Sequence, residues 1–120
     1  MEELTKTEEK IMQILWEIKK GFVKDIIERM DDESKPPYTT ISSVVRILEN
    51  KGFVDHKAYG KTHEYYPAIS KSEYRKANFK RLVKNYFDGS TESLLSFMVK
   101  EEKLDEKELQ KLKDIINKKS

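Results

Sequence analysis

The stretch PYTTISSVVRILENKGFVDHKAYGKTHEYYP, from Pro37 to Pro67, decides the fold. Residues 39–50 place apolar side chains at helical spacing, which predicts a helix with one buried face. Gly52 is expected to end this helix. Residues 53–59 and 62–68 then have the composition of two strands joined at Gly60-Lys61, so the helix leads directly into a hairpin.

The two faces of this predicted helix differ in chemistry. The expected buried face is Ile41, Val44, Val45 and Leu48. The opposite side carries short hydroxyl side chains and one arginine: Thr39, Thr40, Ser42, Ser43 and Arg46. Hydroxyls near a helix start often cap it, but short polar side chains also let a helix approach a DNA groove. Arg46 is the residue on this side that can make a bidentate contact to guanine, and Lys57 and Lys61 on the hairpin can pair with phosphates.

Two further helices are predicted before this stretch, over residues 6–20 and 23–30. Thr5 and Glu8 fit a capping box at the first start, and Gly21 is expected to end that helix. Three helices followed by two strands are the plan of a winged helix-turn-helix. The predicted fold class is therefore mainly α with a small β-hairpin.

After residue 70 the chain changes character. Helices are predicted over residues 72–87, with Ser72 as cap, over an apolar segment around 94–99, and over residues 105–118. Eight apolar residues in the last two need a surface to pack on: Leu94, Leu95, Phe97, Met98, Leu109, Leu112, Ile115 and Ile116. A two-fold homodimer would bury them; the alternative is that they pack on the chain's own N-terminal half. We therefore expect a DNA-binding domain over 1–69 and a helical dimerisation domain over 70–120.

Composition limits the classes of function. The chain has 120 residues, 37% apolar and 38% charged, which is lean for a core and favours burial shared with a second chain. It has no cysteine, so disulfides and thiolate metal sites are excluded. It has no long apolar run and no signal-peptide pattern, so we expect a cytoplasmic protein without membrane insertion.

The charge distribution says more than the formal net charge of +2. Residues 1–69 carry 11 Lys and Arg against 13 Asp and Glu, a net −2, whereas residues 34–63 carry five basic residues against two acidic ones. The acidic balance of the first half leaves an alternative open, in which this is a winged-helix protein-interaction module without sequence-specific DNA binding.

Catalytic chemistry is not indicated. The sequence offers no nucleophile and base pair and no phosphate-binding glycine loop, so we expect no enzyme activity and no cofactor. His56, His63 and Glu64 have the chemistry of metal ligands, but hairpin histidines more often contact phosphate or solvent, so no metal is expected.

Four motifs resemble the penicillinase-repressor family of winged-helix transcriptional repressors (the BlaI/MecI type). They are LTKTEEKIMQILWE, YTTISSVVRILENKGFV, GKTHEYYPAIS and GSTESLLSFMVKEEKLDEKEL, and together they span nearly the whole chain. The resemblance implies a homodimer that binds a palindromic double-stranded DNA operator. It also implies release by cleavage in the C-terminal region, triggered by a membrane-bound sensor metalloprotease that detects β-lactam.

The resemblance places the cleaved bond at Ser96-Phe97. The best-studied relatives have Asn before the Phe, and this chain has Ser96. They also commonly carry Arg where Ile47 stands here, so the operator sequence is expected to differ. Copper-responsive relatives end in cysteine motifs, which this chain lacks.

Overall fold

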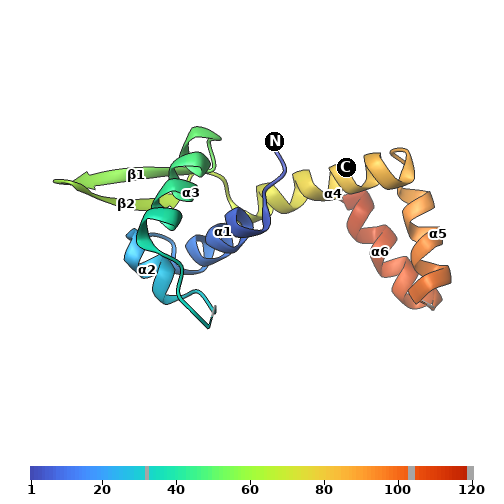
Figure 1. The fold of residues 1–120 in the computed structure, drawn as a ribbon. Helices are drawn as coiled ribbons and strands as arrows, with labels where there is room; N and C mark the ends of the chain where they lie inside the picture. The colour runs from blue at the N-terminus through green and yellow to red at the C-terminus, as the bar shows by residue number, and fades with distance from the viewer. Residues whose placement is uncertain (32, 103–104, 119–120) are drawn as a thin grey trace. The chain divides into compact units, whose positions relative to one another are not determined.

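The computed structural model describes residues 1–31, 33–102 and 105–118, without the side chains of residues 102 and 116–118. The elements follow in the order α1 (Lys6–Ile18), α2 (Val23–Glu28), α3 (Tyr38–Asn50), β1 (Val54–Tyr59), β2 (Thr62–Pro67), α4 (Lys71–Phe87), α5 (Thr91–Glu102) and α6 (Glu106–Lys118) (Figure 1). The predicted fold class, mainly α with one hairpin, is confirmed. Two compact units, Met1–Ala77 and Asn78–Ser120, divide the chain, and α4 runs through their boundary.

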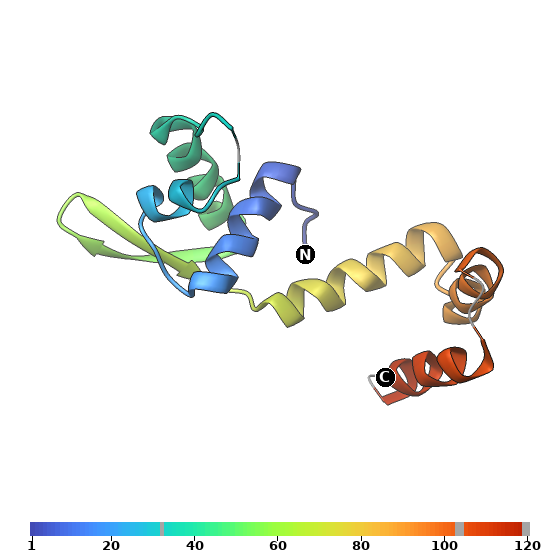
Figure 2. The ribbon, with the colours of Figure 1, turned by 90° about the horizontal axis from the view of Figure 1, so that it is seen from below.

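The core of the first unit lies where α1, α2 and α3 meet the base of the hairpin (Figures 1 and 2). Its most deeply buried side chains are Phe53, Ile11, Met12, Leu15, Ile26, Ile41, Leu48 and Val45. Burying a side chain of this size contributes about 1.5–3 kcal/mol. The helical spacing of these apolar residues therefore fixes which face of each helix points inward.

The hairpin is antiparallel, and Val54 pairs with Pro67 at its base and Tyr59 with Thr62 at its tip. A two-residue turn, Gly60-Lys61, joins the strands, and Gly60 has φ +64°. Glycine adopts this left-handed geometry without a Cβ clash, and turns of this kind match the twist of the strands.

The connection between α1 and α2 is tied to the hairpin. The prediction that Gly21 ends the first helix is wrong. The helix ends at Ile18, and its C-cap residue is Lys19, with φ 75°. Gly21 instead exchanges two backbone hydrogen bonds with Tyr65, of 2.9 and 2.8 Å. A Cβ on Gly21 would lie 2.8 Å from Ile18 Cδ1 and 3.3 Å from Asp25 Cβ, so a larger residue here would crowd the side chains of α1 and α2.

The first turns of α4 pack on the first unit. The indole N–H of Trp16 donates to the carbonyl of Ile69 at 2.9 Å, just before the helix begins. The Tyr74 ring lies 5.7 Å from the Trp16 ring and 5.8 Å from that of Phe53, between centroids. These contacts hold the start of α4 in the first unit. The division of the chain after residue 69 stays a prediction.

Ser70, and not the predicted Ser72, caps α4. The Ser70 hydroxyl accepts from the N–H of Glu73 at 3.0 Å, and the Glu73 carboxylate accepts from the N–H of Ser70 at 3.3 Å. This reciprocal pair satisfies two of the backbone N–H groups that have no helical partner at the start of α4. At the other end, Asp88 and Gly89 have φ of 50° and 80° and stop the helix where the sequence predicted.

The second unit contains the end of α4 together with α5 and α6. Val83, Leu94 and Leu95 are its buried apolar side chains among the described residues. Searched over the same residues, the chain has no helix long and apolar enough to cross a membrane.

One charged group of the first unit is buried. The Glu8 side chain completes the capping box predicted with Thr5, whose N–H donates to it at 2.9 Å. The Lys51 ammonium, at the end of α3, donates to both Glu8 oxygens at 3.0 and 2.9 Å. Burial alone would raise the pKa of Glu8, but the hydrogen bonds from Thr5 and Lys51, with the charge of Lys51, hold this pKa below its ordinary value of 4.5.

We predict that Glu8→Gln lowers the free energy of unfolding at neutral pH by about 1.5–3 kcal/mol, because it removes a charged hydrogen bond to Lys51. A lowered folded-state pKa means that the ionised Glu8 stabilises the fold above pH 4.5, and that this contribution is lost as the pH falls below it. Urea unfolding followed by the fluorescence of Trp16, the one tryptophan, measures both effects.

Glu9→Gln is the matched control, since Glu9 is an exposed acid in the same helical turn. It should leave the free energy of unfolding within about 0.5 kcal/mol of wild type. Equal losses in the two variants would contradict the role given to Glu8.

Candidate nucleic-acid interface

The predicted polar side of α3 lies open to solvent. Thr39, Thr40, Ser43 and Arg46 are exposed and Ser42 is half-buried, whereas the opposite face, with Ile41, Val45 and Leu48, is in the core. The apolar face anchors the helix and leaves a row of hydroxyls and one guanidinium at the surface. The DNA-binding role of these five residues stays a prediction.

The hydroxyls at the start of α3 do not cap it. Pro37 is the N-cap residue and makes no side-chain cap hydrogen bond. Its carbonyl accepts from the N–H of Thr40 at 3.1 Å as the first turn begins. Proline before the first turn has a fixed φ that suits a helix start. The capping role left open for Thr39 and Thr40 therefore does not apply, and both side chains are available for other contacts.

The hairpin presents its two lysines to solvent. Lys57 is exposed on β1, with its ammonium 5.3 Å from the centre of the Tyr59 ring. Lys61 is exposed in the tight turn. The Tyr59 ring in turn lies 5.9 Å from that of Phe22, which supports the outer face of the hairpin. Cationic groups on such a projecting hairpin are suited to phosphate contacts.

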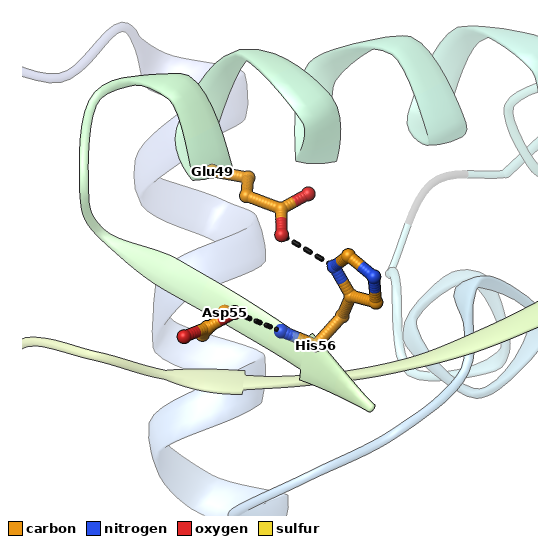
Figure 3. Close-up of side chains that lie close together, drawn as sticks. All are labelled: Glu49, Asp55 and His56. Atoms are coloured by element: carbon orange, nitrogen blue, oxygen red, sulfur yellow. Dashed lines mark hydrogen bonds and ion pairs between the residues drawn. The ribbon is translucent and has the colours of Figure 1, made fainter. Parts of the chain in front are cut away.

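Between α3 and the hairpin lies a polar contact that the sequence did not predict. His56 Nδ1 on β1 is hydrogen-bonded to the carboxylate of Glu49 in the last turn of α3 (Figure 3). The His56 ring also stacks on that of His63 of β2, with centroids 4.1 Å apart and planes 8° from parallel. The two histidines therefore face the helix. The suggestion that they assist phosphate binding at the hairpin stays untested.

Arg46 and Tyr65 form a second link between α3 and the hairpin. Burial raises the pKa of the Tyr65 hydroxyl, and the negative charge of Glu49 adds to this rise. The positive charge of the Arg46 guanidinium, beside the hydroxyl, opposes this rise in the pKa. Arg46 is nevertheless exposed, so its planar group lies at the edge of the interface with donors to spare.

Between α3 and β1 lie side chains with the chemistry of metal ligands. Three donor groups, those of Glu49, Asp55 and His56, have ligand atoms within 4.8 Å of one another. Each is already bonded within the protein, since Asp55 Oδ1 accepts from the backbone N–H of His56 at 2.8 Å and Glu49 bonds the His56 ring (Figure 3). Glu64 pairs with Lys57 in the register and is not part of this group. The expectation of no metal stays a prediction.

In the second unit, the residues predicted for dimerisation have different environments. Leu94 and Leu95 are buried within the unit, and Met98, Leu109 and Leu112 are half-buried. Phe97 and Ile115 are 51% and 56% exposed, and the side chain of Ile116 lies outside the described residues. Of this set, Phe97 and Ile115 are the side chains that most clearly lack cover from their own chain.

The sequence reasoning overlooked an apolar stripe on α4. Phe79, Leu82 and Tyr86 are 41%, 42% and 78% exposed, and Val83 beside them is buried. Positions 79, 82, 83 and 86 are spaced by three or four residues, which is the spacing of one helix face. Basic residues alternate with this stripe in the sequence, at Lys80, Arg81 and Lys84, so the local composition is polar.

The bond aligned with the cleavage site lies inside α5. Ser96 and Phe97 are both exposed, and the Phe97 ring lies 5.6 Å from that of Phe87. The backbone at this bond is helical.

The family model of the penicillinase repressor matches residues 4–118. The chain belongs to the penicillinase-repressor family. Members of this family are transcriptional repressors, so the predictions of a repressor and of no enzyme activity are confirmed.

Two relatives of this penicillinase-repressor chain align with it over nearly its whole length. It is 29% identical over 117 residues to the methicillin resistance regulatory protein MecI of Staphylococcus aureus (strain N315). The aligned residues cover 98% of this chain and 95% of that relative. It is 20% identical over 114 residues to the penicillinase repressor of Bacillus licheniformis, and the aligned residues cover 95% of this chain and 89% of that relative.

The solved structure of the DNA-binding domain of the repressor BlaI has a similar fold. The match has a TM-score of 0.52 at 24% identity and covers 60% of this chain and 88% of that one. The winged-helix fold predicted for this member of the penicillinase-repressor family is thereby confirmed.

Proposed function

We propose that this chain is a homodimeric repressor that binds a palindromic operator in double-stranded DNA and is released when its C-terminal region is disrupted or cut. The observation that carries the proposal is the solvent-facing row on α3, where Thr39, Thr40, Ser43 and Arg46 lie exposed while the other face is buried. In a helix-turn-helix the second helix enters the major groove, and α3 occupies that position here.

The interface has two kinds of contact in this proposal. Arg46 reads a base edge, since its guanidinium can donate two hydrogen bonds to guanine. Lys57 and Lys61 bind phosphates, which orient the protein without reading sequence. Such a repressor acts at the chromosome, which in a bacterium lies in the cytoplasm.

Dimerisation is supported by the apolar surface of the second unit. Five large apolar side chains of this unit are exposed to solvent: Phe79, Leu82, Tyr86, Phe97 and Ile115. Exposed apolar patches mark surfaces that bind another protein. A two-fold dimer would cover such a surface with its own copy and present two recognition helices to two half-sites. The palindromic operator follows from that symmetry.

Release by proteolysis is proposed from the family resemblance, with a membrane-bound sensor protease as partner. The Ser96-Phe97 bond is exposed, but its backbone is part of α5. A protease cuts backbone that has opened locally, so cleavage there requires α5 to unwind. Loss of the dimer then weakens DNA binding without any change in α3.

We predict that Arg46→Ala weakens binding to a duplex selected from a random pool by about 1–3 kcal/mol, and affects random duplex much less, because a base contact is lost. Lys61→Ala is the matched control, since it removes the same charge but only a phosphate contact. It should weaken both duplexes equally and reduce the dependence of affinity on salt. Fluorescence anisotropy titrations across a range of salt concentrations measure these differences.

Two results would count against this assignment. Equal weakening of both duplexes by Arg46→Ala would mean that Arg46 does not read bases. Failure of the wild-type chain to bind any duplex at low salt would favour the alternative, a winged-helix protein-interaction module.

We predict that truncation after Asp88 gives a monomer whose affinity for the selected duplex falls by a factor on the order of 10² to 10⁴, because the second half-site is no longer bound intramolecularly. Analytical ultracentrifugation gives the oligomeric state, and the same titration gives the affinity. A truncated chain that still forms a dimer and binds tightly would refute this mechanism.

A further inference from the structure

The contact between Glu49 and His56 joins the two parts of the candidate interface. Glu49 lies in the last turn of α3, on the helix that carries Arg46, and His56 lies on β1, the strand that carries Lys57 (Figure 3). An ionised carboxylate only accepts hydrogen bonds, so Nδ1 of His56 is the donor. Both side chains are about 30% exposed or less, at 27% for Glu49 and 30% for His56, so the bond is partly shielded from water.

The His56 ring is held on its other side by the second strand. It pairs with Tyr65 in the register and lies 5.8 Å from that ring, between centroids. It also stacks on His63, so its plane is fixed by two aromatic neighbours. The ring therefore links both strands of the hairpin to one carboxylate of the helix.

The hairpin needs such a link because few contacts hold its outer half, where the Tyr59 ring packs against Phe22. A two-stranded hairpin alone is at most marginally stable in water. Its base is anchored by the buried residues Phe53, Val54 and Tyr65, whereas residues 57–62 are exposed. In both views the hairpin extends well beyond the three helices (Figures 1 and 2). His56 is the point on β1 nearest the tip at which a described hydrogen bond reaches α3.

We propose that His56 is a positioning residue for DNA recognition, which fixes the angle of the hairpin against α3 so that Lys61 and Arg46 contact the duplex together. This inference rests on the proposed function, because it assumes that both residues bind DNA. The contact is already formed in the unbound protein. Binding to DNA therefore costs no further conformational entropy for ordering the hairpin against α3, which is the advantage of a preorganised interface.

The first test separates the donor of His56 from its ring. His56→Phe keeps a flat ring for stacking but removes the bond to Glu49, and His56→Asn keeps an N–H near the place of Nδ1. We expect His56→Phe to weaken binding of the full-length chain to the selected duplex about three- to tenfold. His56→Asn should retain affinity within about twofold of wild type. The titrations contain EDTA, so that a bridging metal ion cannot supply the link.

The second test neutralises the acceptor, because the amide oxygen of Gln still accepts a hydrogen bond but carries no charge and makes a weaker one. Glu49→Gln loses the carboxylate but also removes a negative charge near DNA, which by itself strengthens binding. Glu64→Gln is the matched control, since it makes the same charge change on β2 at a position that is not part of the Glu49 contact. We expect Glu49→Gln to bind at least threefold more weakly than Glu64→Gln.

The third test asks whether hairpin and helix contacts depend on each other. We compare the fold loss of affinity caused by Lys61→Ala in two backgrounds. In the His56→Phe background we expect this fold loss to be less than half of that in the wild-type background, because the tip of the hairpin is no longer held at the phosphate. Unfolding followed by Trp16 fluorescence shows that each variant is folded at the temperature of the titration.

The outcomes distinguish this inference from the proposed function. Equal effects of Lys61→Ala in the two backgrounds, or equal losses in His56→Phe and His56→Asn, would overturn the positioning role while leaving DNA binding intact. If wild type binds no duplex, the proposed function fails first. Reduced coupling with rescue by His56→Asn would support the inference.

Discussion

Burial of one face of α3 is the constraint on which the rest of the first unit depends. Ile41, Val45 and Leu48 are almost wholly removed from water, and they pack with the apolar faces of α1 and α2. A helix of thirteen residues has little freedom to rotate once these three are placed. The exposure of Arg46 and the threonines is a consequence of that packing.

The hairpin is attached to this core by a different kind of force. Its base contributes Phe53, Val54 and Tyr65 to the apolar cluster, whereas its middle is held to α3 by directed polar contacts through Glu49, Arg46 and the histidines. The hydrophobic effect has no directional requirement of its own, but a hydrogen bond weakens steeply as its angle departs from linear. Polar contacts are therefore better suited to set an angle, and apolar ones to hold a position.

The elements were predictable because their signals are local. Apolar spacing indicated α1, α2 and α3, and the Gly60-Lys61 pair indicated the turn. What the sequence could not indicate were contacts between residues far apart in the chain: Glu8 with Lys51, Gly21 with Tyr65, and Trp16 with Ile69. Gly21 was mistaken for a helix end for that reason, since its role depends on a strand more than forty residues away.

The candidate interface was predictable to the same extent. The hydroxyl row and the lysines follow from helical and hairpin periodicity alone, but the pairing of His56 with Glu49 requires β1 to turn back beside the last turn of α3 (Figure 3). The stripe of Phe79, Leu82 and Tyr86 follows from the helical spacing of α4, although basic residues lie between its members in the sequence.

The two hydrogen bonds between Gly21 and Tyr65 also protect the protein against unwanted association. An open strand edge offers unpaired N–H and C=O groups to any other chain, which is a route to aggregation. Gly21 pairs with the edge of β2 that does not face β1, so only a short length of that edge stays open toward the tip. There the charge of Lys61 disfavours pairing with a second hairpin.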